Sequence, residues 1–399
     1  MRLSPTAIII LAGSAVIALS FGVRSVFGVV LDPLSTDLGW ARETFSLSIA
    51  IQNMVWGLAQ PAFGLIADRF GDRRAIWLGF FVYVAGMLLA TLGFAPWMQH
   101  LGAGVLVGMG VAGTAFGLVL AVVGRAVPDE KRSMALGTTA ALGALGQMVL
   151  PLVASWLTGA YGWQTALFAM TLVLLPMAAF IPLLKTPEPG PDAVPEPALP
   201  FKAMMAQAFG HSSYLLLMSG FFVCGFHVAF MTAHFPAYVT EVCGSVTLGA
   251  ATLSIIGLAN VMGTFVFGAL GARYPKPYLL SMIYALRAVV ITIFVLIPPT
   301  PITVVVFSMV IGVIWLSTVP LTSALVASMF GPKNMATLYG FVFLSHQIGS
   351  FLGVWMGGRV YDLTGSYDVM WWIAVALGVA SAIVHLPVRE TRVGAPVPA

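Results

Sequence analysis

Apolar residues gather in twelve long segments of this chain, separated by short polar or charged stretches. Each segment has about 20 residues or more, which is the length that a helix needs to cross the hydrocarbon of a bilayer. The pattern therefore predicts an all-α membrane protein with twelve transmembrane helices. They fall in two sets of six, at residues 5–32, 43–68, 74–95, 98–125, 133–158 and 163–185, and at 211–240, 247–272, 276–297, 302–327, 334–360 and 367–387.

The composition supports a location in a bilayer. Hydrophobic residues make up 59% of the 399 residues and charged residues 8%, whereas about 25% of the residues of a soluble domain are charged. The first apolar run, residues 5–31, is longer than the roughly 7–15 residues of a signal-peptide core, so we interpret it as a retained first span. The 42 glycines suit helices that pack closely in a bundle.

A proline-rich stretch, residues 185–200, separates the two sets of spans. So many prolines exclude a helix and favour an extended linker. We therefore expect an N-terminal six-helix bundle at residues 1–185, a cytoplasmic linker at 186–208 and a C-terminal six-helix bundle at 209–399.

The distribution of basic residues predicts the orientation. With both termini in the cytoplasm, fourteen of the 18 Lys and Arg residues face the cytoplasm and only Arg42 and Arg359 face outward, while Arg24 and Arg287 fall within spans. This bias obeys the positive-inside rule. We expect a multi-pass protein of the cell membrane, namely a bacterial inner membrane. The net charge of +4 need not indicate nucleic-acid binding, because in a membrane protein the distribution of charge matters more than its sum.

Few other chemical motifs are present. Cys224 and Cys243 lie near the two ends of one predicted helix, about 28 Å apart at about 1.5 Å per residue, which excludes a disulfide between them. The sequence has no Cys/His metal spacing and no H-E-x-x-H, G-x-S-x-G or P-loop motif. We expect no enzymatic activity, no cofactor, no metal and no nucleic-acid partner, and we expect a monomer.

Two stretches about 200 residues apart repeat each other, with a glycine, a basic residue, a phenylalanine and a later proline at equal spacing. They are Gly22-x-Arg24-x-x-Phe27 with Pro33, and Gly225-x-His227-x-x-Phe230 with Pro236. A duplicated membrane bundle with a basic residue at the same place in each half is typical of a two-domain transporter. The repeat therefore predicts both a fold and a candidate site.

Residues 64–74 read Gly-Leu-Ile-Ala-Asp-Arg-Phe-Gly-Asp-Arg-Arg. This stretch resembles the G-x-x-x-D-R-x-G-R-R/K signature between spans two and three of the major facilitator superfamily, except that Asp72 stands where a basic residue is common. The resemblance implies the two-bundle fold and a latch between the halves in the outward-open state. We expect Asp68 to accept hydrogen bonds from a helix N-terminus of the other half, near Asn334. The latch residues are then Gly64, Asp68, Arg69, Gly71 and Arg73.

Two weaker patterns accompany this motif. The matching place in the second half, residues 268–274, is a decayed copy without the aspartate, in which Gly268 and Arg273 lie 204 positions after Gly64 and Arg69. In span five, glycines and a proline loosely resemble a pattern of antiporters, although glycines at such spacings are more often packing devices. These are Gly137, Gly143, Gly146 and Pro151.

Residues 21–28, Phe-Gly-Val-Arg-Ser-Val-Phe-Gly, and the Leu-Gly-Trp-x-Arg at residues 38–42 resemble the monocarboxylate-porter and oxalate/formate-exchanger branch of the superfamily. The resemblance implies a small carboxylate as substrate. The guanidinium of Arg24 matches a carboxylate bidentately, although Arg24 could instead pair with Asp32 or with backbone carbonyls. Carboxylate-transporting relatives often place an arginine in span eight, where this chain has Asn260.

Three further basic residues within the spans are candidates for the site. His227 could donate to an anion or carry a proton, or be a neutral, hydrogen-bonded core residue. His346 lies near the middle of span eleven, where relatives in the oxalate/formate branch can carry a basic residue. Arg287 must turn inward, toward Asn260 or Tyr284, because a lipid-facing arginine is too costly, and it belongs either to the site or to the scaffold.

The other residues expected to bind substrate are uncharged, namely Gln52, Asn53, Gln147 and Asn260. Any of them could instead bond between helices. Trp56 and Trp315 could close over a substrate. Acidic side chains within the spans lie near helix ends, as Asp32 and Asp68 do, so the site should be electropositive and attract anions.

These features predict a secondary transporter of small organic anions, monocarboxylates first, that works by alternating access. Proton symport is the expected coupling, with His227, His346 or Asp32 as the carrier, and anion exchange is the other option. A multidrug or other small-molecule exporter on the same fold is the alternative. A membrane sensor or an intramembrane enzyme is a remote alternative.

Overall fold

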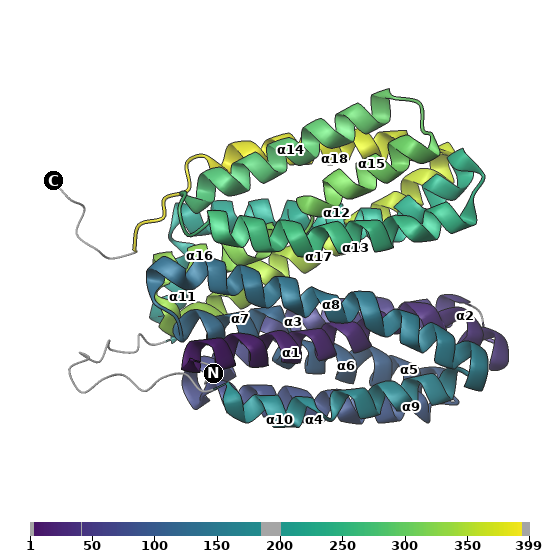
Figure 1. Ribbon diagram of the computed structural model, residues 1–399, viewed down its shortest axis with the longest axis horizontal. Coiled ribbons are helices and arrows are strands. Elements are labelled where there is room, and N and C mark those ends of the chain that lie inside the picture. The colour runs from purple at the N-terminus through teal and green to yellow at the C-terminus, as the bar shows by residue number, and fades with distance from the viewer. Residues whose placement is uncertain (1–3, 41, 185–200, 393–399) are drawn as a thin grey trace.

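The computed structural model describes residues 4–40, 42–184 and 201–392, here called the first half up to residue 184 and the second half from residue 201. Within these ranges every regular element is a helix, so the chain is an all-helical, multi-pass membrane protein (Figure 1). Eleven segments of the described chain are long and apolar enough to cross a membrane: Pro5–Leu31, Leu47–Phe70, Asp72–Thr91, Pro96–Arg125, Asp129–Tyr161, Trp163–Leu183, Ser212–Cys243, Thr247–Leu270, Lys276–Leu296, Pro301–Phe330 and Asp368–His385.

The helices follow the predicted order. The first half contains α1 (Pro5–Ser25), α2 (Phe27–Asp37), α3 (Arg42–Phe70), α4 (Asp72–Thr91), α5 (Pro96–Gln99), a π-helix (His100–Leu106), α6 (Val107–Thr114), α7 (Phe116–Arg125), α8 (Asp129–Tyr161), α9 (Trp163–Leu174) and α10 (Met177–Phe180). The second half contains α11 (Phe201–Phe209), α12 (Ser212–Cys243), α13 (Val246–Leu270), α14 (Lys276–Leu296), α15 (Pro301–Val313), α16 (Thr318–Phe330), α17 (Met335–Thr364) and α18 (Asp368–His385).

Two segments differ from the prediction. The expected linker at 186–208 ends in a helix, α11, and its proline-rich part, residues 185–200, lies outside the described residues. The expected eleventh span, 334–360, is the helix α17, which has 30 residues but is not among the eleven apolar segments.

Spans four and ten are each broken near the middle. In span four, Ala115 has extended backbone (φ −102°, ψ −160°) between α6 and α7. In span ten, residues 314–317 separate α15 from α16. A break leaves backbone N–H and C=O groups without partners in their own helix, and inside a membrane protein other groups must satisfy them.

Two pairs of helices make the largest contacts between the two halves. Within the halves α1 packs on α8 and α12 on α17, whereas α3 packs on α17 and α8 on α13 across the boundary. In Figure 1, α1, α4 and α9 lie in the lower part of the molecule, and α13, α14 and α18 lie in the upper part.

Glycine sets the close approach of α8 to α13. A Cβ atom added to Gly137 would lie 2.5 Å from the Cα of Gly268, and one added to Gly268 would lie equally close to Gly137. The two backbones are therefore in direct contact, which only glycine permits. Gly146 packs in the same way against the Ala18 carbonyl of α1, so at this glycine the span-five pattern works as a packing device.

Candidate functional site

Arg24 lies in the last turn of α1 and reaches toward α3. Its guanidinium donates to Asn53 Oδ1, and its Cζ lies 4.8 Å from the ring centroid of Trp56 and 5.5 Å from that of Phe21. Its Nε has no hydrogen-bond partner, and none of the described carboxylates is ion-paired with it. The side chain of Asp32, the other expected partner, lies outside the described residues. A guanidinium held by one amide oxygen and two ring faces keeps donors for an anion.

Asn53 brings this arginine to the boundary between the halves. Its Nδ2 donates to Ile49 O (3.0 Å), which fixes the amide so that Oδ1 faces Arg24. From the second half, Gln347 Nε2 donates to the Asn53 backbone oxygen (3.0 Å). The helices touch here, since a Cβ on Gly57 would lie 2.7 Å from Gln347 Cβ.

Aromatic rings continue the contact into the second half. The Trp56 ring lies 4.6 Å from Phe343, and Phe343 stacks on His346 at 5.3 Å. His346 Nδ1 lies 3.3 Å from Gln347 Oε1. We call this set the Arg24 cluster: Arg24, Asn53, Trp56, Phe343, His346 and Gln347.

Contacts inside the two halves correspond at an offset of 204 residues. Ser20 Oγ lies 2.8 Å from Thr114 Oγ1 in the first half, and Cys224 Sγ lies 3.2 Å from Thr318 Oγ1 in the second. Each pair joins the first span of its half to the broken fourth span.

A second pair of contacts has the same offset. Trp56 Nε1 donates to Gln60 Oε1 (3.1 Å), and Thr264 Oγ1 donates to Asn260 Oδ1 (3.1 Å). Two independent pairs of contacts thus agree on 204, the value that separates the two copies of the loop motif.

His227 consequently corresponds to Val23 and not to Arg24. The sequence repeat pairs Arg24 with His227 at an offset one residue smaller, and one residue is about 100° around a helix. Val23 and His227 are both buried, and the imidazole faces α18, where Nε2 lies 2.8 Å from Ala374 O. The prediction that Arg24 and His227 occupy equal places is therefore wrong, and the structure does not bring His227 into the Arg24 cluster.

Arg287 and Asn260 lie at the break of span ten. The Arg287 guanidinium donates to Ile314 O from Nε (3.0 Å) and Nη2 (2.7 Å), and to Trp315 O. Asn260 Oδ1 accepts from the backbone N–H of Leu316 (2.9 Å). A cation suits the C-terminal carbonyls of α15. Of the two roles left open for Arg287, these contacts match the scaffold.

The remaining uncharged candidates also lie apart from Arg24. Gln52 is buried and its Nε2 donates to Ala103 O of the π-helix (2.7 Å), so it supports span four. Gln147 is exposed on α8. Of the uncharged residues predicted to bind substrate, only Asn53 contacts Arg24.

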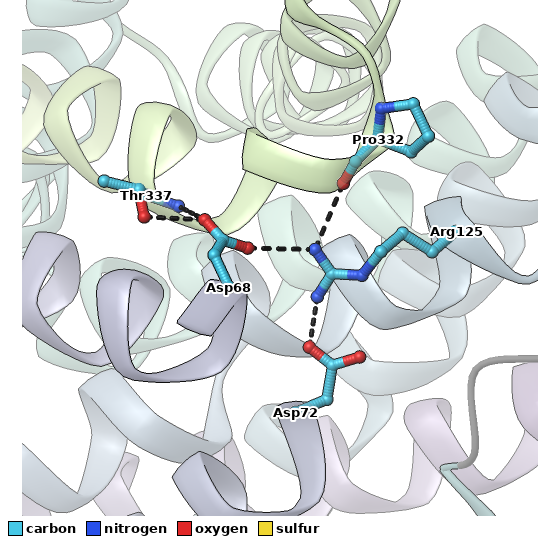
Figure 2. Close-up of polar contacts among 5 residues, drawn as sticks. All are labelled: Asp68, Asp72, Arg125, Pro332 and Thr337. Carbon is cyan, nitrogen blue, oxygen red and sulfur yellow. Dashed lines mark hydrogen bonds and ion pairs between the residues drawn. The ribbon is translucent and has the colours of Figure 1, made fainter. Parts of the chain in front are cut away.

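The two halves are also joined at the loop between α3 and α4 (Figure 2). Asp68 Oδ2 accepts from the backbone N–H (2.9 Å) and the hydroxyl (2.6 Å) of Thr337, the third residue of α17. The N-cap residue Asn334 makes no side-chain capping bond. Asp68 therefore caps α17 from the other half, a place normally taken by the helix's own N-cap residue.

Arg125, at the end of α7, completes this junction. Its Nη1 donates to Asp68 Oδ1 (3.1 Å) and to Pro332 O (3.1 Å), and its Nη2 pairs with Asp72 (Figure 2). Asp72, the residue that departs from the sequence motif, thus pairs with Arg125 and helps Asp68 to neutralise it.

The other residues of the motif shape the loop. Gly64 packs on the backbone of Ala336, where a Cβ would collide, and Gly71 has φ +97°. Arg69 lies over the Phe201 ring at 5.8 Å, and Arg73 is exposed.

Sequence reasoning missed Gln347, Phe343 and Arg125. Phe343 and Gln347 lie one helical turn apart on the face of α17 that touches α3, a spacing that could have grouped them with His346. Arg125 looked like one of many cytoplasmic basic residues, and only the fold brings it to Asp68.

Comparisons with known proteins agree with this arrangement. The family model described as Major Facilitator Superfamily matches residues 13–354 and 245–399. Monocarboxylate transporter 13 of Bos taurus is 25% identical over 384 residues (93% of this chain, 86% of that protein), and the uncharacterized MFS-type transporter YcxA of Bacillus subtilis is 25% identical over 377 residues (91% and 90%). The crystal structure of the human organic anion transporter MFSD10 superposes with a TM-score of 0.74 at 14% identity, covering 96% of this chain and 100% of that one. These relatives and structural neighbours are transporters and not enzymes.

Proposed function

The chain belongs to the Major Facilitator Superfamily, and on that premise we propose that it is a secondary transporter of small organic anions, with monocarboxylates as the first substrate class. Relatives of this chain include monocarboxylate transporter 13, which supports the substrate class. The two halves would rock around a site between them, so that the site opens to each side in turn.

The Arg24 guanidinium is the observation that carries the proposal. It reaches from α1 to α3 beside the contact of α3 with α17, its described neighbours are an amide oxygen and aromatic rings, and no described carboxylate neutralises it. A cation inside a membrane span is costly and needs a counter-charge. A substrate carboxylate would supply that charge and accept two parallel N–H bonds.

Uptake into proteoliposomes tests the assignment. A panel of mono- and dicarboxylates, amino acids and cationic drugs should give uptake and thermal stabilisation with carboxylates alone. Arg24→Gln should lower that uptake about 100-fold, because the charge-assisted hydrogen bonds are lost. Arg359→Gln removes the same charge from an exposed position and should leave uptake unchanged. Full uptake by the Arg24 variant, or stabilisation by cations only, contradicts the proposal.

We propose proton symport with His346 as the carrier. Of the three coupling candidates, His346 belongs to the Arg24 cluster, His227 faces α18, and the Asp32 side chain lies outside the described residues. A proton on the His346 imidazole would offset the charge of a bound anion and travel with it.

The orientation follows from the basic residues and from the helix α17. We propose α17 as the twelfth span, because 30 residues measure about 45 Å and the polar groups that lower its hydropathy contact other helices. The two halves would then be six-helix bundles with both termini in the cytoplasm of a bacterial inner membrane.

In that orientation the protein would face outward. The side-chain hydrogen bonds that join the described halves run from Asn53–Gln347, near the middle of α3, to Asp68–Thr337, at its cytoplasmic end. The latch at Asp68 would hold this part closed. The topology can be tested with single cysteines near the start of α13 and the end of α17, in a background without Cys224 and Cys243. These cysteines should be labelled from outside the cell.

The aromatic groups around Arg24 favour a variant of this proposal in which the substrate is a bulky aromatic acid. Phe21, Trp56, Phe116 and Phe343 form a continuous series of ring contacts. Such a surface suits a bulky aromatic acid as well as a small one. Export of such an acid is the second candidate function, and adding aromatic carboxylates to the uptake panel, with counterflow in both directions, separates the two.

A further inference from the structure

Trp56, which lies over the Arg24 guanidinium, is itself held by a buried amide. Its Nε1 donates to Gln60 Oε1 (3.1 Å), one turn along α3. Gln60 is 0% exposed, and its Nε2 donates to Ala112 O (3.1 Å), just before the break of span four. The oxygen of the Gln60 amide thus accepts from α3, and its nitrogen donates to α6. These two bonds fix the orientation of the amide.

The space around this amide is closed. Gly117, in the first turn of α7 after the break, packs directly on it, and a Cβ at Gly117 would collide with Gln60 Nε2. Gln60 therefore touches span four on both sides of the break, at Ala112 and at Gly117. Any shift of the break moves the amide, and any shift of the amide moves the hydrogen bond to Trp56.

The second half provides a comparison without a substrate site. There Asn260 Oδ1 accepts from Thr264 and from the N–H of Leu316, 204 residues after Ala112. In the second half Asn260 stands where the first half has Trp56. The Asn260–Thr264 hydrogen bond therefore positions no aromatic ring over a cation.

We infer that Gln60 is a positioning residue: it sets the Trp56 ring against Arg24 and couples this part of the site to the break in span four. Substrate affinity, and not only helix packing, then depends on a residue that does not touch the substrate. The affinity part of this inference rests on the proposed function, whereas the placement of Trp56 does not.

Fluorine NMR of the protein labelled with 5-fluorotryptophan measures the placement without any ligand. The chain has 10 tryptophans, and the Trp56 resonance is the one that Trp56→Phe removes. Gln60→Leu should shift that resonance, and Thr264→Val, which removes the equivalent bond of the second half, should leave it in place. Gly117→Ala presses on the same amide from span four and should shift it too. It also serves as the test if Gln60→Leu does not fold. An unchanged Trp56 resonance in the folded variants overturns the inference.

Transport of the monocarboxylate that the wild type takes up best measures the affinity part. Gln60→Leu should raise KM about fivefold, the value of one buried hydrogen bond, and leave the maximal rate within about twofold. In a Trp56→Phe background, which lacks the N–H, the same change should have little further effect on KM. An unchanged KM, or equal effects in both backgrounds, overturns the affinity part. If the resonance shifts but no carboxylate is transported, Gln60 still positions Trp56 and it is the proposed function that fails.

Discussion

Arg24 and Arg287 both lie within membrane spans, and they differ in what their donors reach. Arg24 donates to one side-chain amide and lies over the Trp56 ring. Arg287 is 1% exposed and donates to the carbonyls of Ile314 and Trp315, at the break of span ten. Each arginine keeps one buried nitrogen without a partner, Nε in Arg24 and Nη1 in Arg287. An arginine whose other donors meet backbone carbonyls supports the helix that provides them, whereas one whose donors meet only a side-chain amide near the boundary of the halves can bind an anion. The nature of the acceptors, and not the depth of the residue in its span, separates the two roles.

The largest difference between the two arginines is expected in protein stability when each is replaced. Arg287→Met leaves the Ile314 and Trp315 carbonyls without partners and should lower the free energy of unfolding by about 3 kcal/mol. Arg24→Met loses one side-chain partner and should change it by less than about 1 kcal/mol. Heating the detergent-solubilised variants and measuring the monodisperse fraction compares them. Equal losses for the two variants would contradict the assignment of Arg287 to the scaffold.

The latch offers a second contrast between the halves, because only the first copy of the loop has the aspartate. Asp68→Asn weakens both the cap on α17 and the pairing with Arg125 and should lower transport about tenfold. Arg273→Gln, in the decayed copy, should lower it less than twofold. Ligand-induced thermal stabilisation should survive in both variants, since neither residue belongs to the Arg24 cluster. Loss of ligand stabilisation in Asp68→Asn would show that the loop acts on binding.

His227 and His346, two of the buried histidines, allow a comparison in which a smaller effect is expected. If His346 carries the coupling proton, uptake by the wild type rises as the external pH falls from about 7.5 to 5.5, because the inward proton gradient then drives the anion. His346→Gln should give uptake that hardly depends on pH, and His227→Gln should keep the wild-type slope because its ring faces Ala374. A flat profile in His227→Gln, with a normal slope in His346→Gln, would reverse the assignment.

The smallest effect is expected where the halves are most alike. Cys224 faces Thr318 as Ser20 faces Thr114, so Cys224→Ser reproduces a pairing that the first half already uses. We expect a change in unfolding free energy of less than about 1 kcal/mol, and unchanged uptake. Thermal unfolding of Cys224→Ser beside Cys243→Ser measures this. A large loss of unfolding free energy for Cys224→Ser would show that the Ser20–Thr114 and Cys224–Thr318 pairs are not equivalent.

Much of the architecture could be predicted because it depends on composition over long windows. Eleven of the expected spans coincide with apolar helical segments, since about 20 residues of low polarity have few alternatives to a membrane helix. The contact of Asp68 with the start of α17 was predicted to within three residues, because a motif and a helix N-terminus are both local features.

Features that depend on one residue of register could not be predicted. The repeat of Gly22 and Gly225 suggested an offset of 203, and the contacts of Ser20 and Cys224 show that the helices correspond at 204. Periodicity cannot detect this difference, because apolar residues dominate all faces of both segments. The role of Arg287 was also beyond the sequence, because it depends on where the neighbouring span breaks.

The contact between Gly137 and Gly268 has a mechanical consequence. Where two backbones touch with no side chains between them, nothing interlocks, and α8 can roll or slide on α13 without changing rotamers. The pair lies near the end of α13 and the start of α8, at the cytoplasmic side of the proposed topology, where the two halves would have to separate in the proposed rocking motion. A methyl group at either position would act as a wedge there and keep α8 and α13 apart, while leaving the Arg24 cluster untouched.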